Sequence, residues 1–209
     1  MADLHTVRHP LVHHKLARLR DRATPPDQFR RLVHELGLLL AVEATRHLPT
    51  RPCSVQTPLE TCTGQTLAGG GLVLVPVLRA GLGLLDSFLT LVPEARIGHV
   101  GLYRDPQSLE AIDYYCKLPD GLEDCDALVL DPMLATGHSA VAALQRVRAA
   151  RPRTLGLVCL VGCPEGIAAV QAAHPDVAIV TAAVDRGLDA HGYILPGLGD
   201  AGDRQFGTG

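Results

Sequence analysis

One short segment combines an acid, a tight loop and small polar residues in an order that suits phosphate binding. Residues Ala127 to Leu130 are apolar and bounded by turn formers, which indicates a buried parallel strand. Asp131 follows this strand, and after a loop of small residues a helical stretch opens at Ser139. Such a strand, loop and helix start gather backbone N–H groups and the positive helix end at one point, where phosphate binds. The adjacent acid suits a ligand that also carries hydroxyls, such as a phosphorylated sugar.

Two common nucleotide-binding loops do not fit this segment. A triphosphate loop would continue with Gly-Lys-Ser/Thr, and a dinucleotide fold would show Gly-x-Gly-x-x-Gly, and the segment has neither. Residues 131–139 instead resemble the phosphoribosyl diphosphate loop of the phosphoribosyltransferases. The form Asp-Pro-Met-Leu-Ala-Thr-Gly is the one seen in the uracil phosphoribosyltransferase family. The resemblance covers nearly the whole chain, through 9–12, 76–83, 101–104 and 164–167, and closes with 191–194 and 196–203.

The rest of the chain predicts the elements that must position this loop. Apolar runs predict strands at 72–77, 97–102, 127–130, 154–161 and 177–183, with helices at 82–91, 140–150 and 166–173. This alternation predicts an α/β fold, a phosphoribosyltransferase-like parallel sheet flanked by helices, as one domain over residues 1–209. Residues 109–118 predict a small projecting flap or hood, and residues 49–71 an irregular hairpin. Ligands of such sheets bind at the carboxyl ends of the strands.

The resemblance implies a role for each residue of the loop and its surroundings. Asp131 would accept hydrogen bonds from the ribose hydroxyls, and the loop after it would cradle the 5′-phosphate. Arg79 and Arg104 would clamp the diphosphate by multidentate hydrogen bonding. Asp131, Arg104 and Asp200 are the candidate catalytic residues. The remaining candidate substrate-binding residues of the loop are Pro132, Met133, Leu134, Ala135, Thr136, Gly137, His138 and Ser139.

The last 23 residues, 187–209, resemble the base-recognition loop of the family. They contain seven glycines, a spacing that argues against a regular helix or a central strand. Ile194 and the backbone of Gly199 and Ala201 would read uracil, whose N–H and C=O groups main-chain amides and carbonyls can match. Asp200 would lie near the magnesium–diphosphate and the base. An amino substituent on the base would leave a buried mismatched donor, which would exclude cytosine.

His138 is the main departure from the family pattern, which usually has a second glycine there. A histidine at this position is expected to tolerate a left-handed backbone at some strain. Two placements of its ring stay open. The ring points to solvent, which we favour, or it touches phosphate, which would tighten binding below about pH 6.5.

The implied reaction is uracil plus 5-phospho-α-ribose 1-diphosphate giving UMP and diphosphate, a step of pyrimidine salvage. The expected cofactor is Mg²⁺, held mainly by the substrate diphosphate and near Asp200, with no protein metal site. A non-catalytic regulator that binds phosphoribosyl diphosphate or UMP is the alternative, and transfer to another base is a second enzyme alternative. The resemblance also suggests a homodimer or homotetramer, with GTP as a candidate effector.

Composition limits the remaining partners. A net charge of −3 gives no general attraction to nucleic acid or to an anionic membrane surface. The N-terminal residues are polar, and the chain has no uninterrupted apolar stretch of about 18 residues, so neither a signal peptide nor a membrane span is expected. The six cysteines form no Cys-x-x-Cys pair, which favours free thiols in a cytoplasmic protein.

Overall fold

The computed structural model describes residues 3–208 except 105–110, and describes no side chain for residues 103, 104 and 111–113. Its helices are α1 (Pro10–Arg20), α2 (Pro26–Ala44), α3 (Leu82–Leu91), α4 (His138–Ala149), α5 (Pro164–Ala173) and α6 (Ala201–Phe206). The strands of the main sheet are β1 (Leu4–Thr6), β4 (Leu72–Leu78), β5 (Arg96–Ile97), β6 (His99–Arg104), β7 (Ala111–Lys117), β8 (Asp126–Leu130), β9 (Met133–Leu134), β10 (Thr154–Gly162) and β11 (Ala178–Val184). Two small hairpins complete the fold, β2 (Thr50–Gln56) with β3 (Thr61–Leu67), and β12 (Gly187–Leu188) with β13 (Ile194–Leu195).

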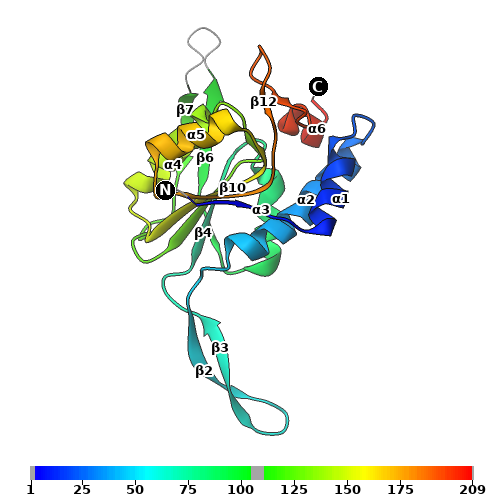
Figure 1. Ribbon diagram of the computed structural model, residues 1–209. Helices are drawn as coiled ribbons and strands as arrows, with labels where there is room; N and C mark the ends of the chain where they lie inside the picture. Colours follow the sequence, from blue (N-terminus) through cyan, green and yellow to red (C-terminus); the bar gives the residue numbers. More distant parts are fainter. Residues whose placement is uncertain (1–2, 105–110, 209) are drawn as a thin grey trace.

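The main sheet is mostly parallel, as the sequence predicts. Its order is β1-β11-β10-β8-β4-β6-β7, and among these described strands only β7 runs antiparallel to its neighbour. The chain leaves β4 through α3 toward one side and leaves β8 through α4 toward the other (Figure 1). The boundary between β4 and β8 is therefore the switch point where ligands bind in such sheets.

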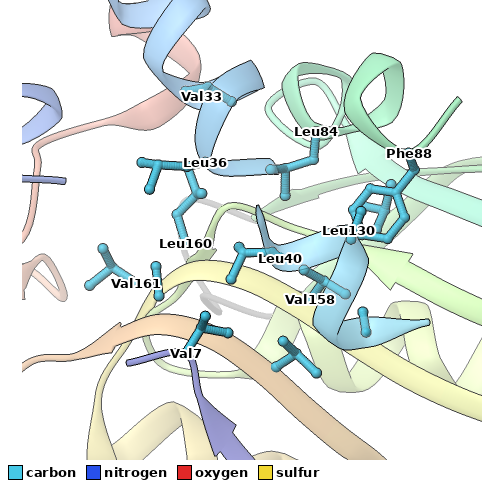
Figure 2. Close-up of a cluster of buried hydrophobic side chains, with 14 of the residues drawn as sticks. Val7, Val33, Leu36, Leu40, Leu84, Phe88, Leu130, Val158, Leu160 and Val161 are labelled. Carbon is cyan, nitrogen blue, oxygen red and sulfur yellow. The ribbon is translucent and has the colours of Figure 1, made fainter. Parts of the chain in front are cut away.

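The central strands are buried on both faces, and this burial explains their near-continuous apolar runs. In β4, Leu72 and Leu74 face the core under α1, α2 and α3, while Val73 and Val75 face the core under α4 and α5. Figure 2 shows the first core, where Leu36 and other side chains of α2 meet β10 and α3. These cores hold the strand ends, and therefore the loops that follow them, in place.

Three local predictions were wrong. Gly98 separates β5 from β6, where the sequence predicts one strand over 97–102. The hairpin of β2 and β3 is regular, with seven antiparallel pairs from Thr50–Leu67 to Gln56–Thr61. The glycine-rich C-terminal segment does contain a helix, α6, because Asp200 caps it by accepting from Asp203 N and Gly207 ends it in a left-handed conformation.

Candidate functional site

A cavity of about 340 Å³ lies at the carboxyl ends of the parallel strands. Ala80 reaches it from the turn after β4, and Asp131 from the end of β8. The loop after Asp131 and the first turn of α4 form one wall, and the C-terminal segment forms the other. The lining residues are Ala80, Asp131, Met133, Leu134, Ala135, Thr136, Gly137, Ser139, Ala140, His191, Gly192, Tyr193, Ile194, Gly199, Asp200, Ala201 and Gly202.

The cavity brings together most of the residues that the sequence singles out. Every residue of 131–139 lines it except Pro132 and His138, and so do Ile194, Gly199, Asp200 and Ala201. His191, Gly192 and Tyr193 also line it; they lie in the C-terminal segment that resembles the base-recognition loop, although they are not among the candidate binding residues. The side chain of Asp189 organises this stretch, since its Oδ1 accepts from His191 N at 2.8 Å and from Tyr193 N at 2.9 Å.

The turn between β4 and α3 approaches the end of β8 closely. A Cβ atom on Gly81 would lie 2.3 Å from the carbonyl oxygen of Leu130, so this position requires glycine. The close approach places Ala80 at the cavity beside the acid that follows β8.

Asp131 is the titratable group most altered by its surroundings here. The residue is partly accessible from the cavity, but the carboxyl group is enclosed by protein, and this desolvation raises its pKa to about 7. The N–H of Met133 donates to Oδ1 at 3.4 Å and opposes the shift. A carboxyl group held in this way accepts hydrogen bonds from a ligand best above about pH 7, where it is ionised.

The loop after Asp131 is bonded to β10 on one side and lines the cavity on the other. The carbonyl oxygen of Pro132 accepts from Leu160 N and Val161 N, and β9 pairs with β10. Gly137 caps α4 with φ of +84°, and a Cβ atom there would lie 2.7 Å from that of Ala169. The resulting strand, loop and helix start match the phosphate-binding arrangement expected from the sequence.

His138 has a different backbone conformation from the one expected. It is the first residue of α4 and has ordinary helical backbone, because Gly137 takes the left-handed conformation instead. The strain expected at His138 is therefore absent, since Arg151 is the one non-glycine residue with positive φ in the described part of the chain. The ring is exposed and lies outside the cavity lining.

We expect His138→Gly to leave phosphoribosyl diphosphate binding nearly unchanged. The reason is that the ring is exposed outside the cavity, so the KM for that substrate should stay within about twofold, and removing imidazole should not alter its pH dependence. Ser139→Ala is the matched comparison, because Ser139 lines the cavity and its loss should raise the same KM. A His138→Gly variant whose KM for phosphoribosyl diphosphate rises as much as that of Ser139→Ala would place the ring on phosphate.

The two arginines of the sequence prediction have different outcomes. Arg79 does not line the cavity, and its side chain is 59% exposed. Its Nη2 lies 3.6 Å from Asp203 Oδ1, and its guanidinium lies over the ring of Phe206, 5.7 Å from the centroid. The side chain of Arg104, at the end of β6, lies outside the described part, as do residues 109–110 of the predicted flap. The diphosphate roles of both arginines stay predictions.

A second, larger cavity of about 490 Å³ opens at the amino ends of the strands, beside the end of α2. Its arginines are already paired with acids: Arg46 with Glu43 at 2.8 Å, and Arg153 with the buried Asp126. It also lies opposite the edge where this fold class binds ligands. The carboxyl-end cavity is therefore the better candidate for the functional site.

The chain is similar to known proteins over its whole length. The family model described as uracil phosphoribosyltransferase matches residues 6–208. The uracil phosphoribosyltransferase of Variovorax paradoxus is 55% identical over 208 residues, covering 100% of both chains. A solved protein of Aquifex aeolicus superimposes with a TM-score of 0.93 at 35% identity, over 98% of both chains.

A more distant structure shows the same fold. The hypoxanthine phosphoribosyltransferase of Trypanosoma cruzi, in complex with IMP, aligns over 76% of both chains with a TM-score of 0.51 and 16% identity. This structure shows only the fold, whereas the family model and the full-length relative at 55% identity show the family. The chain belongs to the uracil phosphoribosyltransferase family.

Proposed function

We propose that the carboxyl-end cavity is where this uracil phosphoribosyltransferase joins uracil to 5-phospho-α-ribose 1-diphosphate, giving UMP and diphosphate. The observation that carries the proposal is the convergence of Asp131, the loop 133–137 and the segment 199–202 on one cavity. The family assignment supplies the activity, and the cavity is where we propose that both substrates bind.

The 5′-phosphate is proposed to bind the backbone N–H groups of residues 135–139 at the start of α4. This helix has 12 residues, so its positive end favours an anion. Asp131, at the base of the loop, would accept hydrogen bonds from the ribose hydroxyls. Pro132 occupies the place next to Asp131, so this carboxylate is the one that the loop offers to the sugar.

Uracil is proposed to bind between Ile194 and the backbone of Gly199 and Ala201. Ile194 is 5% exposed and supplies an apolar contact for a flat base. The glycines let the main chain approach the ring edge, where amides and carbonyls match uracil. Cytosine would leave one of these groups unpaired, which costs binding energy.

Catalysis on this arrangement requires no side-chain nucleophile. The bond between ribose C1 and the diphosphate oxygen breaks ahead of attack by uracil N1, so negative charge gathers on the diphosphate. Uracil N1 then bonds to C1 and gives up its proton, which the departing diphosphate accepts. We propose that Arg79 and Arg104 stabilise this charge, with Asp200 beside the diphosphate and base. Arg79 must then leave Asp203 and Phe206, which its large exposure allows.

Mg²⁺ is proposed as the cofactor. It would be held mainly by oxygens of the substrate diphosphate, near Asp200, whose carboxylate lines the cavity and is a hard ligand of the kind this ion prefers. Within the described residues, no group of three or more His, Cys, Asp or Glu side chains is arranged to hold a metal. One or two carboxylates together with substrate phosphates suit Mg²⁺, which when bound would neutralise charge on the diphosphate.

The deciding experiment supplies labelled uracil and phosphoribosyl diphosphate with and without Mg²⁺. Cytosine, adenine and hypoxanthine are supplied in parallel. We expect UMP from uracil alone and only when Mg²⁺ is present. Binding of phosphoribosyl diphosphate without product from any base would favour the non-catalytic regulator, and product from another base would revise the base site.

A homodimer or homotetramer is proposed from the hairpin of β2 and β3, which projects away from the body of the protein (Figure 1). A lone two-stranded hairpin is marginally stable in water, yet this one exposes Val55, Leu67 and, at its tip, Leu59, which is 95% exposed. A second copy covering the hairpin would remove this apolar surface from water. Light scattering would give the number of subunits, and adding GTP to the assay would test it as an effector.

None of the helices in the described ranges is long and apolar enough to cross a membrane.

A further inference from the structure

Two of the cavity's lining stretches are joined by a short connection, residues 195–198, whose second half is buried. Ile194 lines the cavity on one side of this connection, and residues 199–202 line it on the other. Between them, Gly197 and Leu198 are buried and do not line the cavity. Their placement therefore decides where the base-recognition backbone lies.

The peptide groups of Gly197 are held by one ion pair. Arg20, at the end of α1, bonds both carboxyl oxygens of Asp185 at 2.7 Å each, and Asp185 is 6% exposed in its side chain. The same Asp185 Oδ2 accepts from Gly197 N at 2.8 Å, and the same Arg20 Nη1 donates to Gly197 O at 2.7 Å. One bidentate pair thus satisfies both polar backbone groups of a buried residue.

A second arginine holds the next residue to the same helix end. Arg204 Nη1 donates to Leu198 O at 2.8 Å and to Leu19 O at 2.9 Å, and its Nη2 donates to Asp21 O. Its guanidinium lies over the ring of Phe29, 4.6 Å from the centroid. The last carbonyls of a helix lack partners within the helix, so the end of α1 is a natural anchor for such a cation.

We propose that Arg20 and Asp185, supported by Arg204, are positioning residues that set the affinity and selectivity for the base. This inference rests on the proposed function of the cavity. None of the three lines the cavity, so they act through Gly197 and Leu198. A backbone that reads a base edge by its amides and carbonyls must be held to within about half an ångström, and these contacts supply that restraint.

The test compares Arg20→Met with Arg153→Met. The second variant is a matched control, because Arg153 also forms a bidentate pair with a buried acid, Asp126, but at the amino ends of the strands. We expect Arg20→Met to raise the KM for uracil by about tenfold or more and to lower the preference for uracil over cytosine. The KM for phosphoribosyl diphosphate should stay within about twofold, and Arg153→Met should change neither.

The outcomes separate the inference from the proposed function. Wild-type protein that forms no UMP would overturn the proposed function, and the inference with it. Active wild-type protein, with an Arg20→Met variant whose uracil KM and base preference are unchanged, would overturn the inference alone. An Arg20→Met variant that raises the KM for uracil and the KM for phosphoribosyl diphosphate equally would also overturn the inference. If Arg20→Met does not fold, Arg20→Lys takes its place with the same outcomes, because an ammonium group cannot reproduce the planar fork to Asp185 and Gly197.

Discussion

Asp131→Asn is expected to abolish most of the activity while making the protein more stable above neutral pH. In the proposed site the carboxylate accepts from ribose hydroxyls, and such bonds to a charged group contribute about 1.5–3 kcal/mol each. An amide oxygen accepts more weakly than a carboxylate oxygen. The amide NH₂ group of asparagine also donates at the position where the second carboxylate oxygen would accept from a ribose hydroxyl. We expect kcat/KM to fall by about 100-fold or more, as a steady-state assay with varied phosphoribosyl diphosphate would measure.

The gain in stability follows from the sign of the pKa shift. Burial raises the pKa of Asp131 to about 7, so the folded protein holds the proton more tightly than the unfolded chain. This proton contributes stability fully below the unfolded pKa, and the contribution is lost as pH rises through about 7. Above that pH the ionised carboxylate costs the folded state about 4 kcal/mol. Asparagine is never ionised and avoids this cost.

Thermal unfolding without ligands measures the difference. At about pH 8 the Asn variant should melt about 10 °C above the wild type, and at about pH 5 the gap should be less than half as large. Asp126→Asn is the control, because Arg153 and Thr154 lower the pKa of that buried acid, so the same change should destabilise. If Asp131→Asn and the wild type melt at the same temperature at both pH values, the carboxyl group is not enclosed as described.

The parallel sheet could be predicted because each central strand has a local pattern of its own. Runs such as Leu72 to Val77 are apolar without alternation, since each strand is buried on both faces, and helices separate them. The predicted strand is interrupted only at Gly98, and β5 and β6 on either side of it pair with β4 in the same register. The helix α6 was missed because glycines lower helix propensity, while its cap at Asp200 and its packing on α2 outweigh that cost.

The lining of the candidate cavity could be predicted where the family resemblance covers it, as at Ile194 and 199–201, or where one segment carries a local pattern. Residues 131–139 form such a segment, because an acid, a glycine and small residues follow a buried strand. The position of Arg79 beside Phe206 and the hold of Arg20 on Gly197 depend on contacts between residues more than 100 positions apart, which no local pattern encodes. Strain at His138 was expected because the sequence does not show at which residue α4 begins. In the structure the helix begins at His138, and Gly137 before it adopts the left-handed conformation.

Gly137→Ala is the second large effect that we expect. Gly137 has φ of +84°, a conformation that costs an alanine about 1–2 kcal/mol. An added Cβ would also lie 2.7 Å from the Cβ of Ala169 and 3.0 Å from the carbonyl oxygen of Gly166, so α4 and α5 must move apart. That movement displaces the phosphate cradle at the start of α4. The KM for phosphoribosyl diphosphate should rise by about tenfold or more, with a smaller change for uracil.

Gly71→Ala separates the two causes. Gly71 has φ of +90°, close to that of Gly137, but a Cβ atom there meets nothing within 4 Å. Both variants carry the backbone cost, so both should lower the melting temperature by a few degrees. Only Gly137→Ala should alter the KM for phosphoribosyl diphosphate, because only its methyl group presses on the helix that forms the cradle. If both variants bind this substrate like the wild type, the start of α4 does not hold the phosphate, and the proposed orientation of the sugar in the cavity is wrong.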